Sequence, residues 1–288
     1  MAGPRAGISD DKIAEGAGNE MSTLVKTLPI AQPARLPRAW LPPLLGGAVL
    51  AFLLAPFAAL VFATHWQDLH FAPGDGTAIS VSLLYSLLSL ALVMLLGTPL
   101  AWWLAHYHYR GKWLLDALLL LPLLTPPLAM GILLSSFYGP YAPVGGFLQH
   151  YGVILSNSPP AFVLAQVYGA LPYFVVATRA AFEGVPEELE QISLTLGKTP
   201  WQTFWRVSLP LSQLGLAAGV ALAWVRALGE FGIVLIVAYF PQGIPVKLWV
   251  NLQDIGLSAV YPLLWVFFLV AVPLPLWLGL RSRRQALF

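Results

Sequence analysis

The chain has 288 residues, of which 58% are hydrophobic and only 10% are charged, and its formal net charge at pH 7 is +2. This composition is far too apolar for an ordinary soluble domain, and it indicates an integral membrane protein. There is no cysteine, which excludes disulfides and thiolate metal sites, and the five histidines show no metal-binding spacing. We therefore expect no metal site, and we expect no nucleic-acid partner.

The first 40 residues mix Gly, Pro, Ala and charged residues without a sustained apolar run, so residues 1–40 are predicted to form a mobile cytoplasmic tail. The apolar run that follows is long enough to remain as a span, which argues against a secretory signal. Met21 is an alternative start, and residues 1–20 are expected to be dispensable.

Six apolar runs follow, each long enough to cross a bilayer as a helix of about 20 residues. They lie at residues 41–63, 79–104, 114–137, 159–182, 214–239 and 259–280. We therefore predict an all-α integral membrane protein with six transmembrane helices. Lys and Arg gather before the first run, after the second, around the loop after the fourth and in the basic tail at 281–288. Because positively charged loops stay inside the cell, both termini are predicted to be cytoplasmic.

The cytoplasmic loop at 183–213 is predicted to contain two short amphipathic helices. Pro186 suits the first position of the first helix, and acidic residues follow that favour the positive end of its dipole. These are Glu187, Glu188 and Glu190. One face carries apolar side chains at helical spacing, and Gly197 stands where a left-handed residue ends a helix. That face is made by Leu189, Ile192 and Leu196.

The second helix of the loop is predicted from a capping box between Thr199 and Gln202, with Pro200 at the first helical position. Its apolar side carries Trp201, Phe204, Trp205 and Leu209, and Pro210 leads toward the next span. Two amphipathic helices joined by a glycine fit a hairpin that lies on the lipid surface, and they also fit a docking surface for a soluble partner.

A phosphate-binding loop is suggested by Gly197, Lys198 and Thr199, but the first glycine of that motif would fall at Ile192. The segment also follows a helix, whereas a phosphate-binding loop follows a strand. We therefore expect no ATP binding by this chain, and any ATP that drives the protein must bind to another chain.

Arg226 and Glu230 lie four residues apart in the fifth apolar run, where charged groups are costly. One interpretation is an ion pair within one helix that faces the interior of the bundle. The other is that Arg226 lines the path of an anion, with Glu230 as its orienting partner or as part of a gate. Gly229 and Gly232 flank the glutamate and permit close helix packing or a local break.

The loop resembles a cytoplasmic motif of ABC importer permeases, which reads EAA, three residues, Gly, nine residues, an aliphatic residue, any residue and Leu-Pro. Gln191, Ile192 and Ser193 occupy the EAA positions but depart from them, whereas Gly197 and the residues from Val207 to Pro210 match the motif and its spacing. Four further segments are similar to the molybdate and sulfate branch of these permeases, and the likeness covers about residues 41–280. They are LPLLTPPLAMGILL (121–134), FYGPYAPVGGFL (137–148), FVLAQVYGALPYFVVATRAAFEGV (162–185) and RALGEFG (226–232).

The resemblance implies the permease subunit of a binding-protein-dependent ABC importer of type I architecture, located in the inner (plasma) membrane. Such a chain is not itself an enzyme and binds no cofactor, because ATP and Mg are used by a separate ATPase dimer. Loop 183–213 would couple to that dimer through Glu187, Glu188, Glu190, Gln191, Gly197, Trp201, Leu209 and Pro210. The pathway or gate would be formed by Arg226, Gly229, Glu230 and Gly232.

The resemblance also implies an extracytoplasmic substrate-binding protein, which the outer loop at 239–259 with Trp249 would receive; this loop also reads as an interfacial segment. A second copy of the chain is expected in a molybdate-type system, and a related partner chain in a sulfate-type system. Molybdate is the first candidate for the cargo moved by alternating access, with sulfate, thiosulfate or tungstate close behind.

Two rival classes remain open at this point. A secondary transporter needs no ATPase, but the sequence shows no inverted repeat and no matching pair of broken segments of the kind such carriers often have. A membrane enzyme needs convergent polar groups inside the bundle, and only Arg226 and Glu230 meet that requirement.

Overall fold

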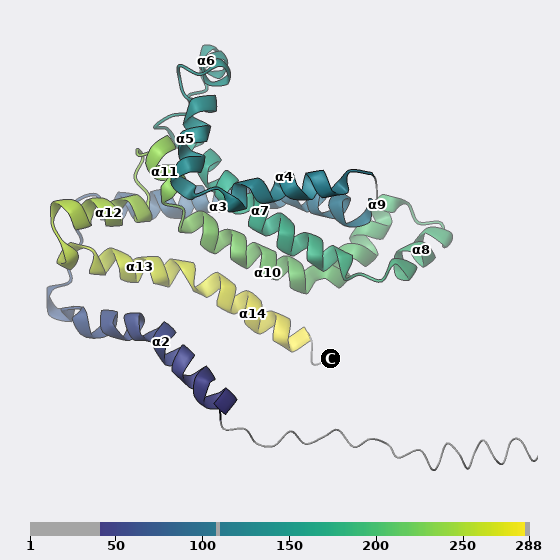
Figure 1. Cartoon of the computed structure of the whole chain (residues 1–288), viewed down its shortest axis with the longest axis horizontal. Helices are drawn as coiled ribbons and strands as arrows, with labels where there is room; N and C mark the ends of the chain where they lie inside the picture. Colours follow the sequence, from purple (N-terminus) through teal and green to yellow (C-terminus); the bar gives the residue numbers. More distant parts are fainter. Residues whose placement is uncertain (1–40, 108–109, 286–288) are drawn as a thin grey trace, which may run out of the picture. The chain divides into compact units, whose positions relative to one another are not determined.

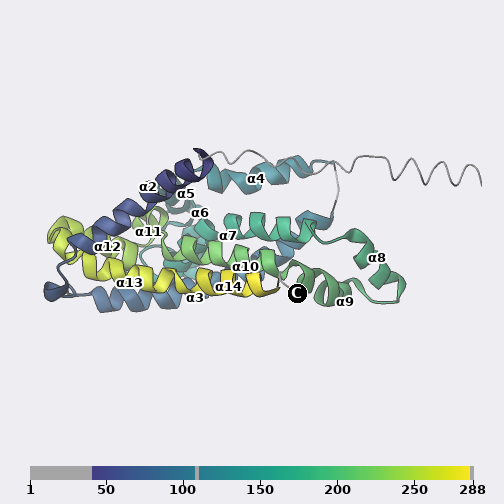
Figure 2. The same ribbon diagram turned by 90° about the horizontal axis from the view of Figure 1, so that it is seen from below.

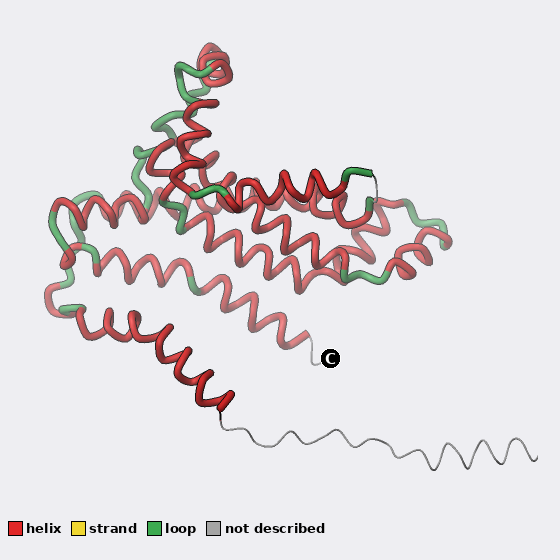
Figure 3. Tube along the Cα trace, viewed as in Figure 1, coloured by secondary structure: helices red, strands yellow, loops and turns green. Residues whose placement is uncertain are grey.

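The computed structural model describes residues 41–107 and 110–285, and in this part of the chain helices joined by loops are the regular structure (Figures 1 and 3). The predicted tail at 1–40, the alternative start at Met21 and the last residues of the basic tail lie outside the described residues. Among the described residues, five helices are long and apolar enough to cross a membrane, or up to six if one sharply bent pair counts as a single span. The fold class is therefore all-α and membrane-spanning.

The chain divides into two units, residues 1–61 and residues 62–288. The described part of the first unit belongs to α2 (Leu41–Ala63), whose last two residues fall in the second unit. Helix α2 exposes nearly all its side chains, as expected of a helix with lipid around it.

The second unit is built on three long helices, α3 (Asp75–His106), α7 (Pro159–Glu183) and α10 (Leu209–Leu228). Helix α7 packs against both of the others (Figure 2). Small residues allow this close approach, because a Cβ at Gly97 of α3 would stand 2.5 Å from the ring of Phe174 on α7. Gly219 of α10 lies in the same way against Thr178 of α7.

A buried glutamine joins the three helices at the same level. The side chain of Gln166 on α7 donates to Ser86 Oγ on α3 at 2.8 Å and to the carbonyl of Ala227 on α10 at 2.9 Å. It also accepts a hydrogen bond from Ser89 Oγ at 2.9 Å. Because every polar atom of the amide has a partner, its burial stabilises the bundle and fixes the register of the three helices.

The third predicted span, 114–137, differs from one straight helix. The structure has α4 (Lys112–Leu124) and α5 (Pro127–Tyr138), bent by 108°. Two consecutive prolines, Pro126 and Pro127, explain the break, since a residue before proline avoids helical geometry and proline has no N–H to continue the ladder. A short helix, α6 (Pro143–His150), follows.

The fifth predicted span, 214–239, is also wrong as a single helix. Helix α10 begins earlier, ends at Leu228 and is followed by a break and by α11 (Gly232–Val237), which packs against α5. The outer loop at 239–259 contains a helix of its own, α12 (Ile244–Asp254). The sixth predicted span corresponds to α13 (Tyr261–Ala271) and α14 (Pro273–Gln285).

Loop 183–213 contains α8 (Glu187–Thr195) and α9 (Pro200–Thr203). The second of these is not a separate element, because a π-helical segment, η2 (Phe204–Ser208), continues it directly into α10. The loop therefore consists of one free helix and the beginning of the next span, which starts at Pro200. Pro186 is the residue before α8 and not its first position.

Candidate functional site

The ion pair predicted between Arg226 and Glu230 is present in the structure. An Nη of Arg226 contacts the carboxylate of Glu230, whose side chain has no exposed surface, while that of Arg226 is 24% exposed. The second carboxylate oxygen accepts a hydrogen bond from the backbone N–H of Ile233 at 2.9 Å. Because both oxygens of Glu230 are engaged, the carboxylate is fixed, and the guanidinium is the partner that reaches open space.

The two glycines beside Glu230 mark the predicted local break. Helix α10 ends at Leu228, and the N–H of the next residue, Gly229, still bonds to the carbonyl of Val225 at 3.0 Å. Gly232 begins α11 and lies against α5, since a Cβ there would stand 2.6 Å from the Cβ of Pro127. Only glycine allows this approach, so the break in α10 meets the break between α4 and α5.

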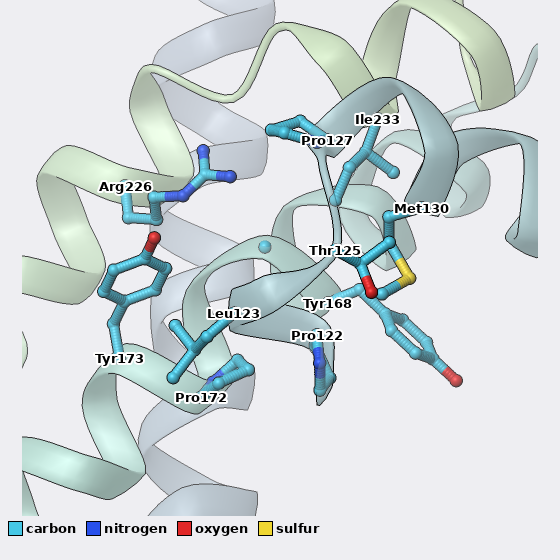
Figure 4. A pocket seen from close by; sticks show the side chains of 11 residues that line it. Pro122, Leu123, Thr125, Pro127, Met130, Tyr168, Pro172, Tyr173, Arg226 and Ile233 are labelled. Carbon is cyan, nitrogen blue, oxygen red and sulfur yellow. The ribbon is translucent and has the colours of Figure 1, made fainter. Parts of the chain in front are cut away.

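A cavity of about 70 Å³ lies where the two breaks meet (Figure 4). Most of its lining residues are apolar, but polar groups make up the larger part of the surface that faces the cavity. The lining residues are Pro122, Leu123, Thr125, Pro127, Met130, Tyr168, Gly169, Pro172, Tyr173, Arg226 and Ile233. Figure 4 shows Arg226 beside Tyr173, and the guanidinium carbon lies 5.6 Å from the centre of that ring. This cation–π contact supports the guanidinium without using its N–H donors.

The loop after α7 forms a hairpin of α8 and α9, which we call the coupling hairpin (residues 186–205). The predicted capping box is confirmed, since Thr199 Oγ1 accepts from the N–H of Gln202 and the Gln202 side chain accepts from the N–H of Thr199. Gly197 is left-handed with φ of +80°, as predicted. A capped helix start next to a left-handed glycine holds the turn between the two helices in one conformation.

The coupling hairpin exposes six large apolar side chains. Leu196 and Trp201 at its tip are 74% and 68% exposed. The others are Leu189, Ile192, Leu194 and Trp205. Phe204 and Leu209, which were predicted on the same side as Trp201, are only partly exposed, and Phe204 packs against Phe182 of α7. We call these six side chains the apolar patch, because this much exposed apolar surface is typical of an interaction site.

Some acidic residues of α8 are exposed to the surroundings, and one is buried against the bundle. Glu187, Glu188 and Gln191 are exposed, and Gln191 donates to Glu187 at 2.9 Å. Glu190, predicted together with them as a coupling residue, is buried and accepts hydrogen bonds from Ser208 Oγ and from the His106 ring. The carboxylate of Glu190 is therefore used inside the protein, and its contact with a docked partner stays a prediction. The last predicted coupling residue, Pro210, is exposed on the first turn of α10.

Sequence reasoning missed four residues of these sites. Thr125, Tyr168 and Tyr173 reach the cavity only because of the broken helices, and His106 reaches Glu190 across 84 residues of chain. Thr125 could have been found, since it precedes the Pro126–Pro127 pair that breaks the third span. No local pattern in the sequence points to His106. Within the described ranges no cluster of His, Asp or Glu has the makeup of a metal site.

The sequence profile of a family described as binding-protein-dependent transport system inner membrane component matches residues 97–284. The chain belongs to this family. The permease is 39% identical over 242 residues, 82% of its own length and 88% of the relative's, to a probable molybdenum ABC transporter permease of Haloferax volcanii. It is 32% identical over 197 residues, 66% and 71% of the two chains, to a sulfate transport system permease of Escherichia coli.

Solved structures agree on the fold. The permease matches a chain of a bacterial alginate ABC transporter, in complex with its alginate-bound periplasmic protein, with a TM-score of 0.66 over 95% of this chain and 96% of that one. The two are 18% identical, so this likeness concerns the fold alone. Family membership makes the permease a multi-pass inner membrane component that uses a binding protein, and ATP is hydrolysed by a separate subunit. The rival classes of secondary transporter and membrane enzyme are excluded on the same ground.

Proposed function

We propose that this permease imports a tetrahedral oxyanion, with molybdate as the favoured cargo and sulfate, thiosulfate or tungstate as alternatives. The observation that carries the proposal is the relative of Haloferax volcanii that is named for molybdenum, because it is 39% identical across 82% of the chain. The relative named for sulfate is less similar and covers less of the chain.

The chemistry of the cavity supports an anionic cargo. Arg226 presents a guanidinium with five N–H donors in a planar fork, which suits the oxygens of a doubly charged oxyanion. One Nη is held by Glu230, and the rest of the group reaches the cavity between the two helix breaks. We assign Arg226 to the translocation path, Glu230 to its orientation, and Gly229 and Gly232 to the break that lets the path open.

The coupling hairpin is proposed to dock an ATPase dimer on the cytoplasmic side, which is also the side proposed for the two termini. Its exposed apolar patch offers anchors at helical spacing to a groove of the partner, and exposed Glu187 and Glu188 stand beside it. ATP binding closes the dimer, the hairpin moves with it, and the spans alternate between inward and outward access.

The segment around α12 is proposed to receive the substrate-binding protein on the outer side, with Trp249 partly exposed on that helix. Two copies of the permease are proposed to surround one path, as expected of the molybdate type.

Uptake in reconstituted vesicles tests the proposal. The permease is purified with its ATPase and supplied with its binding protein, and uptake of radiolabelled molybdate is measured against unlabelled molybdate, sulfate, thiosulfate and tungstate. We expect ATP-dependent uptake that molybdate or tungstate suppresses at the lowest concentration. If sulfate or thiosulfate suppresses uptake at an equal or lower concentration, that anion replaces molybdate as the proposed cargo. Uptake in vesicles without the ATPase would show that transport is not coupled to ATP hydrolysis.

A further inference from the structure

The coupling hairpin is fixed to the bundle by a polar cluster of three residues, Glu190, His106 and Ser208, which we call the Glu190 cluster. Glu190 lies on α8, His106 is the last residue of α3, and Ser208 is the last residue of η2 at the start of α10. His106 Nε2 lies 3.1 Å from Glu190 Oε1 and 2.9 Å from Oε2, and Ser208 Oγ donates to Oε1. One carboxylate therefore connects the free helix of the hairpin to two spans that are far apart in the sequence.

The surroundings of His106 hold its ring in one orientation. Nδ1 lies 2.9 Å from the carbonyl of Trp102, so that one ring nitrogen faces a carbonyl and the other faces a carboxylate. Both neighbours only accept, and an imidazolium with a proton on each nitrogen donates to both at once. The ring also lies 4.9 Å from the Trp102 ring and 6.5 Å from that of Phe182, centre to centre.

Apart from the Glu190 cluster, the inner side of α8 makes few side-chain hydrogen bonds to the rest of the described chain. Ser193 Oγ lies 3.0 Å from Thr203 Oγ1, which joins α8 to α9 within the hairpin but not to the bundle. A helix of nine residues is marginal by itself, so the position of α8 depends on its tertiary contacts. Hydrogen bonds to a charged group are the stronger ones, and they are stronger again where water is scarce.

We propose that His106 is a positioning residue that ties the coupling hairpin to α3, so that a movement of the hairpin is passed to α3 and, through Glu190 and Ser208, to α10. This inference rests on the proposed docking of the ATPase to the hairpin, but the attachment itself is a property of the chain alone. Because Glu190 faces inward, the contact to the partner and the contact to the spans lie on opposite sides of α8.

Two substitutions separate the hydrogen bond from the bulk of the side chain. His106→Gln places an amide N–H near the position of Nε2 and keeps a donor for Glu190, whereas His106→Ala removes it. His150→Gln is the matched control, since His150 is exposed on α6 and outside both sites. The full chain has no cysteine, so Thr195→Cys on α8 and Leu96→Cys on α3 give two exposed, unambiguous spin-label positions.

The first measurement is the distance distribution between the two labels. We expect a narrow distribution in the parent, in His106→Gln and in His150→Gln, and a broad one in His106→Ala. The second is the number of ATP molecules hydrolysed per anion imported in vesicles with ATPase and binding protein. We expect this ratio of ATP to anion to rise about tenfold in His106→Ala, because one hydrogen bond to a charged group is lost. In His106→Gln and His150→Gln the ratio should stay at the parent value.

An unchanged label distribution in His106→Ala overturns the attachment, whatever the ATPase does. A broad distribution with an unchanged ratio of ATP to anion would show that His106 is not needed to pass the movement of the hairpin to the spans. If His106→Ala does not fold, His106→Asn replaces it, because the shorter amide keeps a donor for the Trp102 carbonyl and falls short of Glu190. If the parent itself retains no ATPase, the proposed docking fails, and the label distances still decide whether His106 holds the hairpin.

Discussion

Gly169 on α7 lies directly against the carboxylate of Glu230, and a Cβ built on residue 169 would stand 2.5 Å from Glu230 Oε2. The buried carboxylate thus occupies the space that any other residue at position 169 would need. Glu230 is held on three sides, by Arg226, by the N–H of Ile233 and by the backbone of Gly169. The orientation of Arg226 at the cavity therefore depends on a glycine on a different helix.

Gly169→Ala is expected to displace Glu230 and with it Arg226. Forcing one methyl group into a packed site costs about 1–3 kcal/mol, which we expect as a lower melting temperature in detergent together with a strong loss of uptake. Gly76→Ala on α3 is the control, because no atom lies within 4 Å of a Cβ there, and it should leave both unchanged. Parent-like uptake and stability in Gly169→Ala would show that Glu230 has room to move.

Removing Arg226 distinguishes its role as the ion-pair partner of Glu230 from its proposed role in the anion path. Arg226→Ala leaves Glu230 as an unpaired buried carboxylate, at a cost of about 3–5 kcal/mol. Adding Glu230→Gln removes that charge and should restore the melting temperature, whereas anion uptake should stay low in both variants because the guanidinium is missing. Arg281→Ala, at an exposed position of α14, is the control. If the double variant transports at the parent rate, Arg226 is a structural ion-pair partner and does not line the path.

The sequence predicts most of the helices and the coupling hairpin because both depend on local signals. Apolar runs of sufficient length identify the spans, and the capping box of Thr199 and Gln202 with the left-handed Gly197 places the hairpin. The break after α10 was predicted as one possibility from Gly229 and Gly232, whereas Pro126 and Pro127 signal a break that the predicted span at 114–137 did not include. Their meeting at one cavity was not visible, because it depends on contacts between helices that are distant in the sequence.

Glu190 shows most clearly what cannot be predicted from local sequence signals. Three glutamates stand within four residues at the start of α8, and the preference of acidic side chains for a helix start treats them alike. Only the fold turns Glu190 toward His106 and Ser208 and leaves Glu187 and Glu188 exposed. Such a choice depends on which face of α8 packs, and His106 gives no signal of its own in the sequence.

The outer helix α12 is predicted to depend on Asp75 at the start of α3. Asp75 is fully buried, and its carboxylate accepts from Asn251 Nδ2 on α12 at 2.9 Å and from the N–H of Ala72 at 2.8 Å. Asp75→Ala leaves the N–H of Ala72 and one N–H of Asn251 Nδ2 without an acceptor, at a cost of about 1–3 kcal/mol each, while Nδ2 keeps its bond to the carbonyl of Ala259 at 3.3 Å. We expect faster limited proteolysis within 239–259 in Asp75→Ala. Ser80→Ala, which removes an exposed hydroxyl of the same helix, should be cut at the parent rate. Equal rates in the parent and both variants would show that Asp75 does not hold α12 in place.

Gly197→Val tests the turn of the coupling hairpin. No atom lies within 4 Å of a Cβ at this position, so space is available and the cost is that of a left-handed backbone, about 1–2 kcal/mol and more for a β-branched residue. We expect Gly197→Val to insert normally but to retain less ATPase in a pull-down and to lose uptake. Gly197→Asn, which tolerates the left-handed region, should behave like the parent. Full ATPase retention and uptake in the valine variant would mean that the turn angle does not matter for docking.

Trp201→Ala tests the apolar patch without touching the backbone. Trp201 is 68% exposed, and its ring stacks on Phe204 at 5.9 Å between centres, so its removal opens no cavity in the bundle. If the patch docks an ATPase, the loss of a central aromatic anchor should weaken binding by about 2 kcal/mol or more, which is roughly a thirtyfold change in dissociation constant. Titration of labelled ATPase into permease vesicles measures this constant directly.

Trp113 on α4 provides the matched control for Trp201, because it is 72% exposed and lies outside the coupling hairpin. A hairpin that only rests on the lipid surface would lose the same interfacial contribution in Trp201→Ala as α4 loses in Trp113→Ala, and ATPase affinity would be the same in both. We expect the two to differ, with Trp113→Ala at the parent affinity and Trp201→Ala about thirtyfold weaker. Equal affinities would assign the patch to lipid, and the docking surface would then have to be sought at Glu187 and Glu188.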